Sequence, residues 1–344
     1  MIVIQEQPLR NITAQIFTRL DSSKEEAEIV ANHLVDADLL GVDSHGVIRV
    51  PEYVSKIQGK SKSGFIIKPN AKILVEKESA STFSVDGGSG FGQVVAKKTM
   101  EIAIEKAKIS GICVATARNL DHAGRIGEFT SMAAKCDLVG AMFVKNPPAM
   151  QPYGGTARLI GNDPISYAFP TSNPDRPIFL DMAMSVAAGG KMRFAMDKGE
   201  AVPLGWIVDK DGNPTSDPSD YFDNGGSMLP FSGHKGYGLA IVTEILGGVL
   251  SGAGALNHNP TNNALFALVV NIEAFMPIRE FKANMDKFAS EIKNSPKKPG
   301  VEEIFLPGER EAQTREIRLK EGIPLPERTW QNILKIADDL RIER

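Results

Sequence analysis

The sequence predicts a mixed α/β protein with a β-rich middle and helices at both ends of the chain. Strand-like runs rich in β-branched and aromatic residues, together with glycine turns, concentrate in the middle of the sequence. Helical spacing of apolar residues dominates on either side, and no internal repeat interrupts the chain. We therefore expect a helical region over 1–70 and 277–344, and a β-rich region over 71–276.

The element boundaries follow from local signals. Ser22 or Ser23 can cap a helix, because each has a glutamate three residues further on, and Gly41 suits the position just after the end of that helix. Periodicity predicts further helices at 94–108, 125–135, 185–197, 236–250, 279–293 and 327–340. Alternating or apolar runs predict strands at 72–75, 81–86, 112–115, 138–144, 165–169, 178–181, 206–208 and 264–271.

Composition excludes several classes of protein. The 344 residues carry 39 Lys and Arg against 42 Asp and Glu, which argues against a nucleic-acid partner because phosphate backbones attract a basic surface. No apolar run reaches the ~18 residues of a membrane span, and no signal peptide is visible. Cys113 and Cys136 lie in apolar surroundings, so we expect two buried thiols and a cytoplasmic protein.

A glycine turn at 87–92 lies between a predicted strand and a predicted helix, where a dinucleotide-binding fingerprint would lie. The fingerprint G-x-G-x-x-G fails here, because Gly88 and Gly90 require a glycine at the position of Gln93. The acidic residue expected about 20 positions later is also absent, since Arg118 follows that strand. We interpret the segment as a structural turn and expect no standard Rossmann fold.

Three of the five histidines stand in loops with other polar residues. His45 lies four residues before Arg49, so an imidazole that exchanges protons could share a face with a guanidinium that binds carboxylates. His122 precedes a predicted helix, whose N-terminus would favour the neutral ring. Solvated surface for His45 and a capping role for His122 are the alternatives.

The third loop histidine, His234, indicates a backbone contact, and the other two have ordinary structural roles. His234 lies among glycines that allow close backbone approach, so backbone N–H groups there could face phosphate, although no Walker spacing is present. His33 is expected to be a surface or packed residue, and His258 a residue of a polar loop. The spacing of the histidines predicts no metal site, and the absence of G-x-S-x-G argues against a serine hydrolase.

Seven segments in chain order carry a resemblance to a known family: 43–51, 90–93, 119–124, 146–150, 180–185, 233–238 and 306–309. Through them nearly the whole chain resembles the malate/L-lactate dehydrogenase family of the second, non-Rossmann type. Its relatives include ureidoglycolate dehydrogenase, sulfolactate dehydrogenase, 2,3-diketogulonate reductase and Δ1-piperideine-2-carboxylate reductase.

The resemblance implies a fold and a site. It implies a β-rich nicotinamide-binding domain, a helical domain built from both chain ends, and a homodimer whose active site lies near the subunit interface. It assigns proton transfer to His45 or His122, and carboxylate binding to Arg49 with Ser44 beside it. It places the contacts of NAD or NADP, with NAD preferred, at Asn146, Asp181, Met182, Ala183, His234, Lys235, Gly236, Pro307, Gly308 and Glu309.

The implied reaction is hydride transfer between the nicotinamide and C2 of a small 2-hydroxy or 2-oxo acid. A reductase of cyclic 2-imino acids and a non-catalytic nicotinamide-binding sensor are the alternatives. Two departures from the family pattern could change substrate or cofactor choice. Many relatives have Thr-Asn-Ser where this chain has Val-Lys-Asn at 144–146, and Gly-Thr-Asn-Pro where it has Gly-Asn-Asp-Pro at 161–164.

Overall fold

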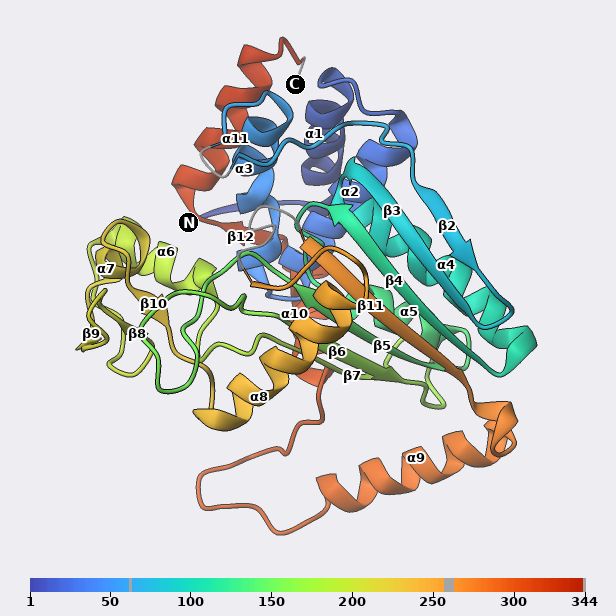
Figure 1. Ribbon diagram of the computed structural model, residues 1–344. Helices are drawn as coiled ribbons and strands as arrows, with labels where there is room; N and C mark the ends of the chain where they lie inside the picture. The colour runs from blue at the N-terminus through green and yellow to red at the C-terminus, as the bar shows by residue number, and fades with distance from the viewer. Residues whose placement is uncertain (62–63, 257–262, 343–344) are drawn as a thin grey trace.

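The computed structural model describes residues 1–61, 64–256 and 263–342, so His258 lies outside the described residues (Figure 1). A seven-stranded sheet with the order β2-β3-β4-β11-β5-β6-β7 forms the centre of the protein. β3 and β4 run parallel, and the other neighbouring strands run antiparallel. The strands are β2 (Leu74–Glu78), β3 (Thr82–Gly90), β4 (Ile112–Leu120), β5 (Leu138–Lys145), β6 (Ile165–Phe169), β7 (Ile178–Met182) and β11 (Asn263–Asn271).

Helices cover both faces of this sheet (Figure 1). α4 (Gly92–Ser110) and α5 (Gly127–Lys135) pack on one face, and α8 (His234–Thr243) with the π-helical segment Glu244–Val249 packs on the other. The alternation of side chains along β11 explains this arrangement. Leu265, Ala267 and Val269 belong to the core under α4, whereas Phe266 and Leu268 face the core that includes α8.

A second core joins the two ends of the chain. β1 (Ile2–Ile4) pairs with β12 (Ile323–Leu325) in antiparallel register, which fixes the C-terminal residues beside the N-terminal ones. Four helices bury their apolar faces around this pair: α1 (Glu6–Arg19), α2 (Lys24–Leu39), α3 (Val50–Ile57) and α11 (Glu327–Asp339). As predicted, Ser23 caps α2 by accepting a hydrogen bond from the Glu26 amide at 3.2 Å, and Gly41 follows the helix with φ +76°.

The remaining elements surround the sheet. A three-stranded sheet of order β10-β8-β9 forms the small lobe at the left of Figure 1, together with α6 (Gly189–Lys198) and α7 (Pro218–Phe222). Its strands are β8 (Ile207–Val208), β9 (Pro214–Thr215) and β10 (Ser227–Met228). α9 (Ile278–Lys293) runs along the bottom of the view with no fully buried residue, and α10 (Glu309–Glu321) leads back to β12.

Several predictions about single elements need correction. The helix expected at 185–197 begins at Gly189, and the helix expected at 236–250 begins at His234 and becomes π-helical at Glu244. Cys113 is buried, but Cys136 is exposed, because it follows the last turn of α5. Within the described residues, no helix is long and apolar enough to cross a membrane.

Candidate active site

The imidazole rings of His45 and His122 stack on each other at the centre of the candidate site. Their centroids are 5.3 Å apart and their planes differ by 25°. His45 comes from the turn between α2 and α3, and His122 from the loop after β4. Both rings are half-buried, which leaves them open to a small molecule on one side.

Two consecutive 3-10 turns, Asp43–His45 and Val47–Arg49, bring Ser44, His45 and Arg49 together. Arg49 Nε donates to the Ser44 carbonyl at 2.8 Å, and the Ser44 hydroxyl lies 2.9 Å from His45 Nδ1. Gly46 makes the sharp connection possible, because a Cβ atom there would lie 1.7 Å from the Asp38 carboxylate. The expected proximity of His45 and Arg49 is therefore present, although it does not arise from one α-helical turn.

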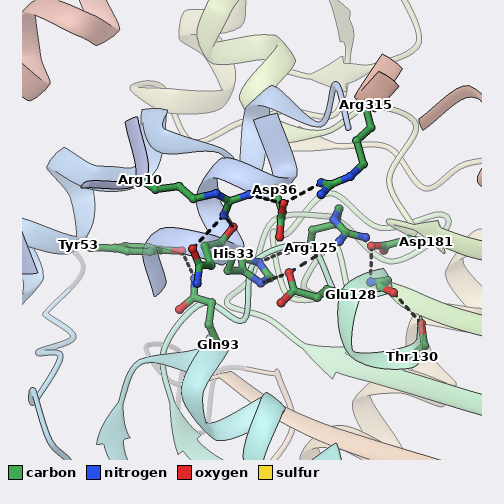
Figure 2. A network of polar contacts seen from close by, with 12 residues as sticks. Arg10, His33, Asp36, Tyr53, Gln93, Arg125, Glu128, Thr130, Asp181 and Arg315 are labelled. Carbon is green, nitrogen blue, oxygen red and sulfur yellow. Dashed lines mark hydrogen bonds and ion pairs between the residues drawn. The ribbon is translucent and has the colours of Figure 1, made fainter. Parts of the chain in front are cut away.

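A hydrogen-bond chain that sequence reasoning missed fixes the orientation of His122. Gln93 Nε2 donates to the Tyr53 hydroxyl at 2.8 Å, as Figure 2 shows, and that hydroxyl lies 2.8 Å from His122 Nδ1. Since the amide supplies one hydrogen to the phenol oxygen, the phenol can donate its own hydrogen to Nδ1. In that tautomer Nε2 carries the ring hydrogen and can donate a hydrogen bond to a substrate oxygen; in the other tautomer Nδ1 donates to the Tyr53 oxygen, which leaves Nε2 able to accept a proton.

Four charged side chains accompany the two rings, and two of them, Lys56 and Asp121, are buried. Lys56 Nζ lies 2.8 Å from a carboxylate oxygen of Asp121 and 2.8 Å from one of Glu52. Glu52 also accepts a hydrogen bond from Arg49 at 2.8 Å. The two cations and two carboxylates balance each other, and Arg49 has the largest electrostatic effect of these charges on both imidazoles. Arg49 at the N-cap of α3 and Tyr53 and Lys56 within it follow helical spacing, and this pattern is the signal that could have revealed them.

Both imidazoles are neutral at pH 7. Burial, reinforced by the positive charge of Arg49, lowers the pKa of His45 to about 3 and holds the pKa of His122 well below its usual range. The neutral form of His122 was predicted, but from the wrong cause. α5 begins five residues later at Gly127, whose amide donates to Asp181 at 2.7 Å, so His122 does not cap this helix.

A third histidine, His33, is fully buried and holds the loop that carries His122. His33 Nε2 accepts a hydrogen bond from the Arg125 amide at 2.9 Å, and His33 Nδ1 lies 2.9 Å from a carboxylate oxygen of Glu128 (Figure 2). Gly124 has φ +75°, and a Cβ atom there would lie 2.0 Å from His33 Nε2. His33 is thus a packed residue, as expected, and it fixes the path of the chain from residue 122 to 127.

The predicted cofactor residues at the end of β7 and before α10 lie side by side. Asp181, Pro307 and Gly308 line one hollow of about 390 Å³, and the Phe179 amide donates to the Pro307 carbonyl at 3.2 Å. Gly308 has φ +94°, and a Cβ atom there would lie 2.7 Å from the Phe179 ring. Glu309 does not line this hollow; its carboxylate accepts a hydrogen bond from the Leu306 amide and closes the turn.

The other predicted cofactor residues come from the start of α8 and from the chain at the end of β7. The segment before α8 pairs with the chain after β7 through a hydrogen bond from the Phe231 amide to the Met184 carbonyl at 2.9 Å. His234 and Lys235 are exposed at the start of α8, and Gly236 packs closely against the Phe231 carbonyl. Met182 and Ala183 are half-buried between these elements.

Asn146 completes the set. Its side-chain amide donates to Asn162 at 2.7 Å, and the Asn162 carbonyl accepts from the Met184 amide at 2.8 Å. The structure therefore gathers Ser44, His45, Arg49 and His122 in one group, and most of the predicted cofactor segments in an adjoining one. No described hydrogen bond joins His234, Lys235 or Glu309 to the two stacked rings.

Comparisons with known proteins agree with a site for small hydroxy acids. The pattern of the malate/L-lactate dehydrogenase family matches residues 4–334. The chain is 39% identical to malate dehydrogenase of Pyrococcus abyssi, over 97% of this chain and 94% of the relative. It is 35% identical to L-sulfolactate dehydrogenase of Methanocaldococcus jannaschii, over 98% of this chain and 97% of the relative. The solved malate dehydrogenase of Pyrococcus horikoshii superposes with a TM-score of 0.90 at 36% identity, covering 99% of this chain and 96% of that one.

These findings define the protein as an oxidoreductase that acts on the CH–OH group of a small hydroxy acid. The chain belongs to the malate/L-lactate dehydrogenase family. Dehydrogenases of this family generally use nicotinamide cofactors, and the geometry of this chain fits such a group. Gly308 lines the hollow beside Asp181, where a Cβ atom would clash with the Phe179 ring, and Arg125 Nε is buried without a hydrogen-bond partner among the described residues. Figure 2 shows Arg125 beside Asp181.

The charges around the rings lead to a stability prediction. We expect Lys56→Met to lower the free energy of unfolding by about 3–5 kcal/mol, because it leaves the buried Asp121 carboxylate without its cation. The matched control is Lys108→Met, whose exposed pair with Glu105 should contribute less than about 1 kcal/mol. Urea unfolding of both variants measures the difference. Equal and small losses would show that the Lys56 pair is not part of the framework.

Proposed function

We propose that this protein transfers a hydride between a nicotinamide cofactor and C2 of a small 2-hydroxy or 2-oxo acid. The observation that carries the proposal is the stack of two neutral imidazoles beside Arg49. Arg49 would bind the substrate carboxylate, with the Ser44 hydroxyl beside it. A bound carboxylate fixes the position of the adjacent carbon, and such positioning is a large source of rate.

One of the two imidazoles would exchange a proton with the oxygen on C2. In oxidation the neutral ring of His45 or His122 accepts the hydroxyl proton, and in reduction the same ring returns it. A substrate carboxylate on Arg49 would offset the cation that lowers both pKa values. Binding of the acid therefore raises the pKa of the rings towards neutral pH, where proton transfer is most efficient.

The cofactor would be NAD or NADP, with NAD preferred, and its nicotinamide ring would carry the hydride. The residues that would hold it are Asn146, Asp181, Met182, Ala183, the start of α8 with His234, Lys235 and Gly236, and the turn of Pro307, Gly308 and Glu309. In this scheme most of these residues belong to a nicotinamide-binding domain over 71–276, and 1–70 with 277–344 form the helical domain. The adjoining positions of these segments and the hollow beside Asp181 support the assignment.

A homodimer is part of the proposal. Five large apolar side chains are exposed along α8 and the π-helical segment, with exposed fractions from 37% to 59%: Leu239, Val242, Ile245, Val249 and Leu250. A contiguous apolar face of this kind marks an interaction surface. Since α8 also begins with His234 and Lys235, pairing through this face would place the active site near the subunit interface.

Turnover with a panel of acids tests the function. NADH and NADPH are offered separately with oxaloacetate, pyruvate, sulfopyruvate and Δ1-piperideine-2-carboxylate, and the absorbance of the reduced cofactor is followed. We expect consumption with at least one 2-oxo acid, faster with NADH. Consumption with the cyclic imine alone would identify an imine reductase, and cofactor binding without turnover of any compound would favour a sensor.

Substitution of each histidine separates their roles. We expect the ring that transfers the proton to lose about 100- to 10,000-fold in kcat when replaced by Gln, because general acid–base catalysis contributes that much. Binding of the reduced cofactor, measured by fluorescence, should stay unchanged in both His45→Gln and His122→Gln. If both variants keep full turnover, neither imidazole transfers the proton.

A further inference from the structure

The two segments that depart from the family pattern, 144–146 and 161–164, lie side by side in the structure. Lys145 is the last residue of β5, and Asp163 lies in the loop that enters β6; the Val144 amide donates to the Pro164 carbonyl between them at 3.0 Å. The side chains of Lys145 and Asp163 are both fully buried. A third buried charge, Glu244, stands at the start of the π-helical segment, and Lys145 interacts electrostatically with both carboxylates.

One of these charges contacts a proposed cofactor residue directly, and the other two lie against the helical segment that follows α8. Asp163 Oδ1 accepts a hydrogen bond from the Asn146 amide at 2.9 Å. Glu244 follows α8 directly, and its carboxylate accepts from the Leu256 amide at 3.0 Å. The stem of Lys145 passes the π-helical segment so closely that a Cβ atom on Gly248 would lie 3.4 Å from Lys145 Cγ.

The loop that carries Asp163 also holds the chain after β7. Asn162 accepts from the Asn146 side chain at 2.7 Å and, through its carbonyl, from the Met184 amide at 2.8 Å. A shift of this loop would therefore move Asn146 and the segment 181–183 together. Because Glu244 directly follows α8, the same shift would also move the helix that carries His234.

Lys145, Asp163 and Glu244 each affect the charged form of the others. One ammonium group faces two buried carboxyl groups, and burial raises the pKa of Asp163 and of Glu244 while it lowers the pKa of Lys145. Asp163 Oδ2 and Glu244 Oε1 are buried without a hydrogen-bond partner among the described residues. Removing the single cation would leave two uncompensated acids, whereas removing Lys145 together with Asp163 leaves one and keeps the net charge of the cluster unchanged.

We infer that Lys145, Asp163 and Glu244 form a positioning cluster that holds Asn146, the segment 181–183 and α8 in register for the nicotinamide cofactor. This inference rests on the proposed function for its ligand, but the register itself can be measured without any cofactor. The residues act through the segments that they hold and do not touch the reacting atoms.

The test compares Lys145→Asn, Asp163→Asn and the double variant. Amide hydrogen exchange is followed in cofactor-free protein for the segments 144–150, 160–186 and 234–249. We expect Lys145→Asn to exchange about tenfold faster in these segments, and the double variant to return to within about threefold of the unmodified protein. The Kd for NADH should rise and recover in parallel. Lys24→Met, which changes an exposed lysine on α2, is the control and should alter neither quantity.

The outcomes decide between the alternatives. If Lys145→Asn fails to fold while the double variant folds, that rescue supports the inference. Unchanged exchange in Lys145→Asn, or a double variant at least as perturbed as the single one, would overturn it. Faster exchange with an unchanged Kd would overturn the link to the cofactor. If the unmodified protein binds neither NADH nor NADPH, the proposed function fails, and exchange still decides whether the cluster holds the three segments.

Discussion

The candidate site depends on one constraint: two imidazole rings stacked beside a fixed guanidinium cannot both carry a charge. The rings of His45 and His122 lie 5.3 Å apart, and Arg49 adds a positive charge within reach of both. Burial and repulsion therefore keep both rings neutral until an anion arrives. The rest of the arrangement preserves this contact by fixing the turn that carries His45 and the loop that carries His122.

The supporting residues divide this task among themselves. The Tyr53 hydroxyl sets the orientation of His122, and His33 holds the loop of residues 122–127 through the Arg125 amide. Lys56 and its two carboxylates bind α3 to the start of the same loop. Glu52 also neutralises part of Arg49, so a substrate carboxylate would compete with an internal one. We therefore expect the site to prefer acids that bind Arg49 through their carboxylate and also bind one of the two imidazoles through the oxygen on C2.

Much of the fold could be predicted because its signals are local. The cap at Ser23, the glycine after α2 and the alternation along β11 need no tertiary information. The failure of the dinucleotide fingerprint at Gln93 also correctly indicated a different fold, and the same glutamine proved to be part of the hydrogen-bond chain to His122. The candidate residues Ser44, His45, Arg49 and His122 came together as expected.

Other features arise only from tertiary contacts. The π-helical turn at Glu244 packs on the buried Lys145, which no pattern within the helix reveals. From the sequence, Tyr53 is indistinguishable from a core residue of an amphipathic helix; its contact with His122 depends on the position of the loop that carries His122. The exposure of Cys136 depends on where α5 ends, and a boundary of that kind is the least certain part of a sequence interpretation.

The most direct test of the central constraint is an NMR titration of the ring nitrogens of His45 and His122. The free protein should show both rings neutral at pH 5 and above, with Tyr53 bonded to Nδ1 of His122. Addition of oxamate, an unreactive carboxylate analogue, should raise the pKa of at least one ring by removing the influence of Arg49. A ring that titrates near the ordinary value of about 6.5 in the free protein, unaffected by oxamate, would contradict the account.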